Sequence, residues 1–286
     1  MVPGTLPRLD SPEVDPATCV NGTLSFRSAI GSLLFIALCT RPDIASAVAV
    51  LARHAESPGK EHVRALLRVI EYLFCTKELG VTYRRDATTP LDTPVVMERA
   101  IHPLDLDRHQ PLVSFSDADY AGAYDRRSTS GYVVFLHGGP VVWASRIQKV
   151  TAQSTAEAEV IAATEAVKEV VHMRLLLQEL GLKRGVQRPT MIMEDNASCV
   201  AFAKDQKNRR TAKHYEVRLR FMQEMVRGGV VEFIQTPTKL QVADILTKPL
   251  HDPHFTVLRD QLLGEVPLEV FRASRGGGVS KGGASN

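Results

Sequence analysis

The chain has 286 residues, of which 44% are hydrophobic and 23% are charged, and its formal net charge is +3. This composition excludes a disordered polycation and supplies enough apolar side chains for one large or two ordinary domains. The longest apolar run, Ala29–Cys39, is too short to span a bilayer, and the first residues lack the apolar core of a signal peptide.

Helical periodicity dominates the first part of the chain. Residues 1–24 are rich in proline and show no period, so we predict a disordered arm. Apolar side chains then recur at helical spacing within residues 25–85 and predict a small helical segment. A break is expected at Thr40–Asp43, because a residue before proline is pushed out of the helical region. The elements expected after this break are helices over Ile44–His54 and Glu61–Phe74 and a short strand over Val81–Tyr83.

The pattern changes after residues 86–111, a stretch with four prolines and no period that we predict to be a linker. Residues 112–250 then alternate between strands and helices, which predicts an α/β fold with a mixed sheet and flanking helices. Residues 251–286 are a C-terminal extension, disordered from about residue 274. The predicted strands are Leu112–Ser116, Gly131–Leu136, Val141–Ala144, Met191–Met193 and Val230–Ile234, and the predicted helices are Thr155–Leu180, Asn196–Lys204, Thr211–Val226 and Leu240–Thr247.

The small net charge conceals two basic stretches. Residues 126–149 contain four Lys or Arg and no acid, and residues 204–220 contain seven Lys or Arg against two acids. Each alone is equally consistent with a solvated surface, but the two together favour a polyanionic partner.

The four cysteines, Cys19, Cys39, Cys75 and Cys199, are scattered along the chain. No two of them have the spacing of a metal-binding pair, and no signal peptide precedes them. This pattern is typical of reduced, buried thiols in an intracellular, cytoplasmic protein.

Four carboxylates stand where predicted strands end or predicted helices begin: Asp117, Glu159, Asp195 and Asp244. In open α/β sheets such positions converge on one crevice. Carboxylates gathered there repel one another unless a cation neutralises them, and oxygen ligands without nearby His or Cys favour Mg²⁺ over zinc. Two such ions, with Mn²⁺ as an alternative, are a known means of hydrolysing a phosphodiester.

Each acid alone also has an ordinary structural explanation, because Asp is common in turns and caps. Ser154 and Glu157 have the spacing of a capping box, which gives Glu157 a structural role and leaves Glu159 for a metal. Of the adjacent Glu194 and Asp195, we expect only one to point into a given crevice. The metal site is therefore predicted from the group of acids and not from any one of them.

Seven motifs follow one another in the sequence. They are F-R-S-A-I-G-S-L-L-F-I-A-L-C-T-R-P-D-I-A-S-A-V (26–48), S-D-A-D-Y-A-G (116–122), R-R-S-T-S-G-Y-V-V-F-L-H-G-G-P-V-V-W-A-S (126–145), S-T-A-E-A-E-V-I-A-A (154–163), E-D-N-A-S (194–198), A-K-H-Y-E-V-R (212–218) and A-D-I-L-T-K-P-L (243–250). In this order they resemble the C-terminal part of a copia-type LTR retrotransposon Pol polyprotein, over about residues 25–250.

The resemblance implies two parts. Residues 25–85 resemble the thumb and connection side of a reverse transcriptase, and residues 112–250 resemble a ribonuclease H domain. In this family that domain cuts the RNA strand of an RNA–DNA hybrid with a two-metal Asp-Glu-Asp-Asp site. Carried onto this sequence, the acids are Asp117, Glu159, Asp195 and Asp244, which agrees with the choice of Glu159 over Glu157.

The chain departs from the family pattern at several places. Val160 stands where an aromatic residue usually follows the catalytic Glu, and Ser145–Gln148 carries one charge fewer than the usual S-K-K-Q. His214–Val217 replaces the usual H-I-D-I. No Y-x-D-D motif occurs, so we expect no DNA polymerisation from this chain alone and a partnership with the missing polymerase palm and fingers of the same polyprotein.

A hybrid duplex is held through phosphates and 2′-hydroxyls, so the expected contacts are basic and polar side chains near the acids. The resemblance places the chain inside the cell, with a virus-like particle or the nucleus as alternatives to the cytoplasm, and implies no membrane partner. Two rival hypotheses are a non-catalytic nucleic-acid-binding remnant and an integrase-type transferase, the second disfavoured by the order of the acids. The candidate nucleic-acid-binding residues are Arg127, Ser128, Thr129, Arg146, Gln148, Lys149, Asn196, Lys213 and His214.

Overall fold

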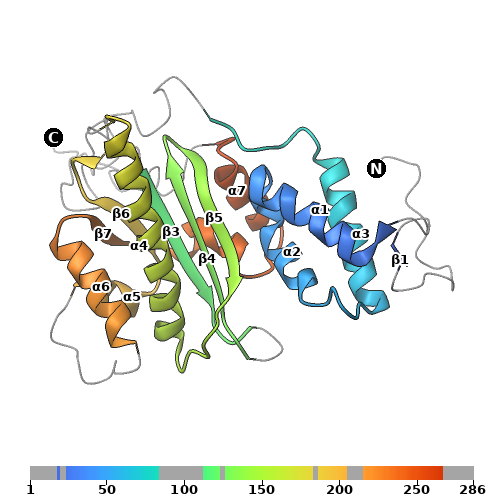
Figure 1. Ribbon diagram of the computed structural model, residues 1–286, viewed down its shortest axis with the longest axis horizontal. Helices are drawn as coiled ribbons and strands as arrows, with labels where there is room; N and C mark the ends of the chain where they lie inside the picture. The colour runs from blue at the N-terminus through green and yellow to red at the C-terminus, as the bar shows by residue number, and fades with distance from the viewer. Residues whose placement is uncertain are drawn as a thin grey trace, which may run out of the picture.

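The computed structural model describes residues 18–19, 24–83, 112–122, 126–182, 186–204 and 215–266. Within these ranges a five-stranded sheet carries helices on both faces, and a further group of helices lies beside one edge of the sheet (Figure 1). This arrangement confirms the predicted α/β class, with a mixed sheet, flanking helices and a preceding helical segment.

The sheet has the strand order β5-β4-β3-β6-β7. Strand β4 is antiparallel to both β3 and β5, whereas β6 runs parallel to β3 and β7 runs parallel to β6. When the five strands are numbered in chain order, their order in the sheet is 3-2-1-4-5. The strands are β3 (Leu112–Asp119), β4 (Thr129–Leu136), β5 (Gly139–Ile147), β6 (Thr190–Glu194) and β7 (Val231–Gln235).

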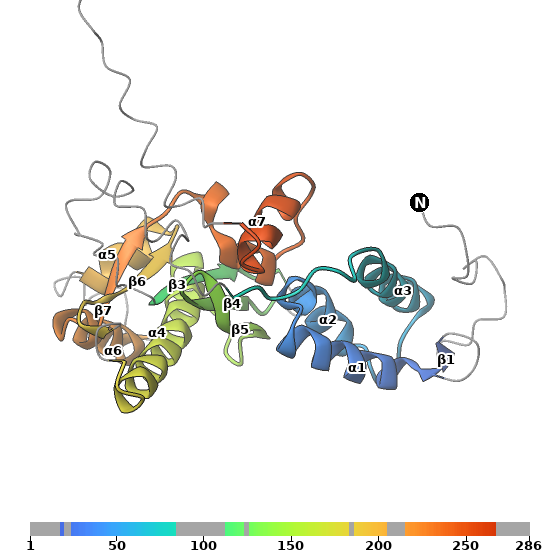
Figure 2. The same cartoon turned by 90° about the horizontal axis from the view of Figure 1, so that it is seen from above.

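Three helices bury an apolar core against one face of the sheet, as Figure 2 shows from above for α4 and α6. The first of them begins at an N-cap, where the Ser154 hydroxyl accepts a hydrogen bond from the Glu157 amide at 3.1 Å. The Glu157 carboxylate accepts from the Gln153 amide at 2.7 Å, one residue before the partner that a capping box uses. The helices are α4 (Thr155–Glu179), α5 (Ala197–Lys204) and α6 (Glu216–Arg227).

The opposite face carries η4 (Thr238–Leu240), η5 (Val242–Leu246) and α7 (His254–Leu262). The short helix predicted over Leu240–Thr247 is present as the 3₁₀ helix η5, with the narrower bounds Val242–Leu246. Gln241, between the two 3₁₀ helices, has an extended backbone and divides the segment.

A glycine allows η5 to lie close to the sheet. A Cβ atom on Gly131 of β4 would come within 2.5 Å of the Thr247 methyl group and 2.9 Å of Leu246 Cβ. Only glycine leaves room for this approach, which brings the end of η5 next to the end of β3.

The helical segment contains α1 (Phe26–Cys39), η1 (Pro42–Ile44), α2 (Ala45–Ala52) and α3 (Lys60–Cys75). Ser25 caps α1 by accepting a hydrogen bond from the Ser28 amide. Pro42 lies at the first position of η1, as expected from the predicted break before proline.

One apolar core joins this helical segment to the sheet. It is formed by side chains of α1–α3, by η5 and α7, and by the face of β3, β4 and β6 that η5 covers. Three hydrogen bonds add to the junction: Trp143 Nε1 donates to the Ala37 carbonyl at 2.8 Å, Thr82 N to the Leu263 carbonyl at 2.8 Å, and Tyr83 Oη to the Pro140 carbonyl at 2.7 Å. The strand predicted over Val81–Tyr83 is wrong, because Thr82 N bonds to the end of α7 and Tyr83 bonds to β5 only through its side chain, so these residues form no backbone ladder with a strand.

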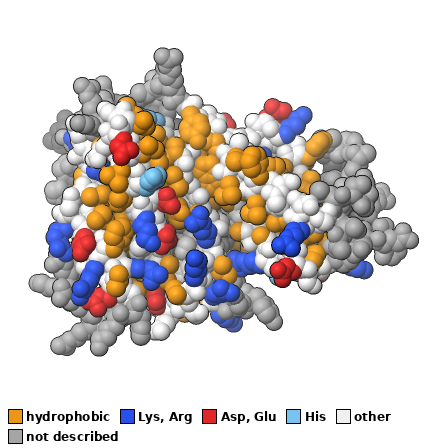
Figure 3. Space-filling model, viewed as in Figure 1, with side chains coloured by type: hydrophobic (Ala, Val, Ile, Leu, Met, Phe, Trp, Pro, Cys, Tyr) orange, Lys and Arg blue, Asp and Glu red, His pale blue; other side chains and the backbone are white. Residues whose placement is uncertain are grey.

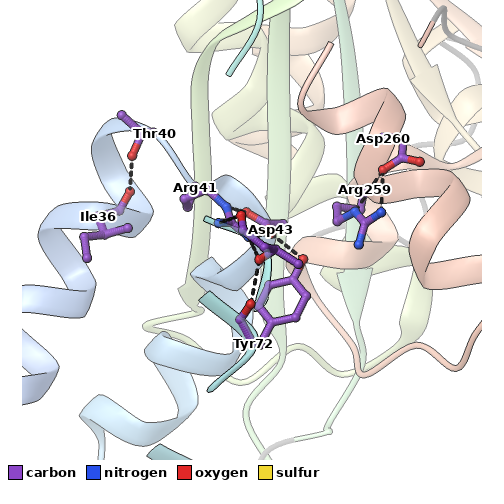
Figure 4. Close-up of polar contacts among 8 residues, drawn as sticks. Ile36, Thr40, Arg41, Asp43, Tyr72, Arg259 and Asp260 are labelled. Atoms are coloured by element: carbon purple, nitrogen blue, oxygen red, sulfur yellow. Dashed lines mark hydrogen bonds and ion pairs between the residues drawn. The ribbon is translucent and has the colours of Figure 1, made fainter. Parts of the chain in front are cut away.

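A buried ionic network fixes the turn between α1 and α2. The Arg41 guanidinium donates from Nε and Nη2 to the two Asp43 carboxylate oxygens, at 2.9 and 2.7 Å. Arg41 also donates to the backbone and side-chain oxygens of Thr76 at the end of α3, and the Tyr72 hydroxyl donates to Asp43 at 2.6 Å (Figure 4). The motif T-R-P-D, read above as a helix break, thus also joins α1, η1 and α3.

Several predicted segments lie wholly or partly outside the described residues. These are the linker, the C-terminal tail beyond residue 266, most of the arm and the first residues of the helix predicted from Thr211. Within the arm, the described residues form a short antiparallel pair, β1 (Thr18–Cys19) with β2 (Leu24–Ser25). The domain boundaries at residues 85 and 112 stay predictions. Among the described residues no helix is both long enough and apolar enough to cross a membrane.

The Arg41 network yields a test of stability. We expect Asp43→Asn to lower the free energy of unfolding by about 3–5 kcal/mol, because it leaves the buried Arg41 charge uncompensated. Tyr72→Phe, which removes one hydrogen bond and keeps the ion pair, should cost about 1–1.5 kcal/mol. Chemical denaturation of the full chain measures both, and equal costs for the two variants would contradict the assignment.

Candidate active site

Carboxylates from three elements converge where the sheet ends. Asp117 lies on β3, Asp195 directly follows β6, and Glu159 lies in the first turns of α4. One carboxylate oxygen from each of these three residues lies within 4.8 Å of the other two. The crevice predicted from the strand ends and helix start is therefore present, and these three predicted acids meet in it.

The fourth predicted acid, Asp244, lies on η5 beside Asp117. Lys248 joins the two, because its Nζ lies 3.0 Å from Asp244 Oδ1 and 3.8 Å from Asp117 Oδ2. The Thr247 hydroxyl also donates a hydrogen bond to Asp117 Oδ2. The structure thus brings all four predicted acids to one place, with Asp117 common to both groups.

A buried glutamine holds η5 on the sheet. Gln241 is fully buried, and its Nε2 donates to the carbonyls of Ser116 at 3.0 Å and Met193 at 3.3 Å, on the neighbouring strands β3 and β6. Its Oε1 accepts from the Ala243 amide at 3.3 Å, at the start of η5. Gln241 therefore couples the two strands that carry Asp117 and Asp195 to the element that carries Asp244.

A fifth carboxylate, Glu194, lies beneath the site. It is fully buried, and its two oxygens accept hydrogen bonds from the Ser116 hydroxyl at 2.8 Å and the Asn196 amide at 3.3 Å. Its neighbour Asp195 is half-buried and accepts from the Thr238 hydroxyl at 2.7 Å. The charges of both acids raise the pKa of Glu159, but only Asp195 joins the group of converging carboxylates, as expected for two adjacent residues.

Burial and mutual repulsion raise the pKa of several of these acids. The pKa of Glu159 rises to about 11, first because burial disfavours its charged form and then because of the charges of Glu194 and Asp117. The pKa of Asp244 rises to about 7 through burial and the charge of Asp117, although Lys248 opposes the shift. The pKa of Asp117 is also raised by burial. In this geometry the carboxylates need a cation in order to be charged together.

The donor set fits a hard divalent cation. Glu159 is 7% exposed, and its Oε2 has no hydrogen-bond partner among the described residues. A buried carboxylate oxygen without a partner is costly, and coordination to a cation would satisfy it. The oxygens of Asp117, Glu159 and Asp195 are ligands that Mg²⁺ and Mn²⁺ favour.

Comparison with known sequences shows which proteins the chain resembles. No protein-family model matches the chain. The chain is 35% identical to a retrovirus-related Pol polyprotein from transposon TNT 1-94 of Nicotiana tabacum, over 82% of the chain and 16% of the relative. It is 31% identical to the Pol polyprotein from transposon RE1 of Arabidopsis thaliana, over 87% of the chain and 16% of the relative.

The chain belongs to the family of retrovirus-related Pol polyproteins from transposons. It spans about a sixth (16%) of the length of these two relatives. It is also 38% identical to secreted RxLR effector protein 161 of Plasmopara viticola, over 51% of the chain and 89% of that protein. A solved structure, the LC11 ribonuclease H1 isolated from compost, aligns over 48% of the chain and 93% of that protein with a TM-score of 0.37 and 17% identity.

Six of the predicted nucleic-acid-binding residues of this Pol segment fall into two groups. Ser128, Thr129 and Gln148 are buried and bonded within the protein, with Gln148 Nε2 donating to the Ser130 hydroxyl and the Ala158 carbonyl at 2.9 Å each. These contacts give them a structural role beside the site. Arg146 and Lys149 are exposed, and Arg127 is half-buried.

Asn196 has a capping role, because its Oδ1 accepts from the amides of Ser198 and Cys199 at the start of α5. Lys213 and His214 lie outside the described residues. On the face shown in Figure 3, Lys and Arg side chains lie mainly in the lower half, toward the end where α4 begins.

Sequence reasoning missed four residues that shape the site: Glu194, Gln241, Thr247 and Lys248. The resemblance places the metal ligand at Asp195 and gives no role to its neighbour Glu194. Lys248 and Thr247 follow Asp244 within the motif A-D-I-L-T-K-P-L, so that motif already contained them. Nothing in the sequence pattern indicated that the Gln241 side chain would be buried.

The raised pKa values predict how stability depends on pH. Because the folded pKa of Asp244, about 7, exceeds its unfolded value of about 4, titration of this acid makes the chain without divalent ions lose stability as pH rises from about 4 to 7. For each proton that the folded chain keeps and the unfolded chain releases, the free energy of unfolding falls by about 1.4 kcal/mol per pH unit. This corresponds to a fall of roughly 3 °C in melting temperature.

Melting temperatures in a chelator from about pH 5 to 8 test this slope, which Asp244→Asn should reduce. Added Mg²⁺ should restore more stability at pH 8 than at pH 5, because it replaces protons. A melting temperature that rises over this range in the chelator would contradict the expected titration.

Proposed function

We propose that this chain is a ribonuclease H-type endonuclease that hydrolyses the RNA strand of RNA–DNA hybrids. The observation that carries the proposal is the buried group of Asp117, Glu159 and Asp195, with Asp244 beside it, at the end of a ribonuclease H-like sheet. Membership in the Pol family supports the substrate class. The polymerase part of the polyprotein is the natural partner of this segment.

The carboxylates of Asp117, Glu159, Asp195 and Asp244 would together hold two divalent cations. Bound Mg²⁺ supplies activation of the attacking water and stabilisation of the leaving oxygen of the phosphodiester. The chain itself fixes the ligands: Thr247 orients Asp117, Thr238 orients Asp195, and Gln241 holds η5. The expected products carry a 5′-phosphate and a 3′-hydroxyl.

The exposed Arg146 and Lys149 at the end of β5 supply positive charge on the same side as the start of α4. Such side chains contact phosphates and add affinity without reading the sequence of the bases. Recognition of a hybrid then depends on its backbone shape and its 2′-hydroxyls.

Two isosteric substitutions on one helix test the proposal. We expect Glu159→Gln to slow cleavage of an RNA–DNA hybrid by at least about 100-fold in Mg²⁺, because it removes a buried carboxylate ligand. Glu165→Gln, on the same helix α4 but pairing with Lys168 on the surface, should leave the rate within about twofold.

The readout is cleavage of a labelled RNA strand, together with a gel-shift measurement of binding. An unmodified chain that shifts the hybrid but leaves it uncut in Mg²⁺ and Mn²⁺ would overturn the nuclease proposal. That result would favour the rival hypothesis of a nucleic-acid-binding remnant.

A charge substitution tests the binding surface. Arg146→Gln should weaken binding to hybrids of different sequence by a similar factor and reduce the slope of log affinity against log salt by about 1. Lys77→Gln, whose side chain is 71% exposed in the helical segment, serves as the matched control and should change neither. An unchanged salt slope for Arg146→Gln would exclude a phosphate contact by Arg146.

A further inference from the structure

The carboxylates of the site divide into two groups with different surroundings. Asp117, Glu159 and Asp195 approach one another, and among the described residues no ion pair reaches Glu159 or Asp195 and Glu159 Oε2 has no hydrogen-bond partner. The pair Asp117 and Asp244 is instead bridged by Lys248. One part of the site is thus open to a cation, and the other already contains one that belongs to the protein.

The position of Lys248 follows from the end of η5. Its backbone amide donates to the Asp244 carbonyl at 3.1 Å, which places its side chain one turn after Asp244 on the same side. Its Nζ lies 3.0 Å from Asp244 Oδ1 and 3.8 Å from Asp117 Oδ2. The preceding residue, Thr247, donates to that same Asp117 oxygen.

The side chain of Lys248 is partly exposed to solvent. The Lys248 side chain is 34% exposed, whereas the side chains of Asp117 and Asp244 are 3% and 2% exposed. Both of its recorded ion pairs are with these two carboxylates. A flexible four-carbon side chain that is partly exposed can therefore move further into water without disturbing the buried backbone around it.

We propose that Lys248 is a tethered cation that competes with a divalent ion for the carboxylates of Asp117 and Asp244. In the absence of metal its single positive charge offsets the repulsion between these two carboxylates, which lie in a dry environment. When a second divalent ion binds, the ammonium must withdraw, so the second ion binds more weakly than the first. Lys248 would thereby set the metal concentration at which the site becomes fully loaded.

The inference rests on the proposed function, because it concerns the same metal site, but it is tested by counting ions and not by cleavage. The probe is Mn²⁺, titrated into the full-length chain without nucleic acid and followed by electron paramagnetic resonance of the free ion. The unmodified chain should show two binding steps of unequal affinity.

Replacing the lysine should make the affinities of the two binding steps more similar. We expect Lys248→Met, which keeps the length of the side chain and removes the charge, to tighten the second step by about tenfold or more. Lys248→Arg should retain the unequal steps. Lys168→Met, which breaks a surface ion pair on α4, is the matched control and should change neither step.

Stability gives a second readout. In a chelator, the Lys248→Met variant should melt at a lower temperature than the unmodified chain. Saturating Mn²⁺ should raise the melting temperature of the variant by more than it raises that of the unmodified chain. Lys248→Gln is measured in parallel, with the same expectations, in case the methionine variant fails to fold.

The outcomes separate the two proposals. If the unmodified chain binds no Mn²⁺ at millimolar concentration, the proposed metal-dependent nuclease fails. If it binds two ions but the neutral variants leave the second step unchanged or weaker, only the role of Lys248 is overturned.

Discussion

Repulsion among buried carboxylates is the constraint around which this structure is arranged. Asp117, Glu159, Glu194 and Asp244 are all nearly or fully buried within a small space, and burial raises the pKa of each. The chain answers this repulsion locally, with the Ser116 hydroxyl on Glu194, the Thr247 hydroxyl on Asp117 and the ammonium of Lys248 between Asp117 and Asp244. What these contacts leave unsatisfied, above all Glu159, defines where an external cation is required.

The geometry of the site depends on apolar packing that extends far beyond it. The short helix η5 carries Asp244 and lies between the sheet and the helical segment, and its apolar side chains belong to the same core as those of α1–α3. Gly131 lets η5 approach β4, and Gln241 fixes it to β3 and β6. The helices before the sheet therefore help to position the fourth carboxylate, although none of them contributes a ligand.

The sequence pattern was sufficient for the parts of the structure that depend on local periodicity. The strands of the sheet and the long helix α4 follow from alternation, helical spacing and a Ser cap, and the acids at their ends follow from the general geometry of α/β sheets. It was insufficient where side chains make long-range polar contacts, as at Gln241 and Lys248. The strand expected at Val81–Tyr83 failed for the same reason, because its hydrogen-bond partners are carbonyls of Pro140 and Leu263, distant in sequence.

The position of β5 has a consequence for how the protein behaves outside its native context. This strand is at the edge of the sheet, and the apolar core of α1–α3 packs against its Trp143, whose indole donates to α1. An uncovered edge strand is a template for pairing with another chain. A fragment that begins at β3 would expose both the edge and the indole, and it would tend to aggregate. The helical segment therefore keeps the neighbouring sheet soluble by covering its edge strand.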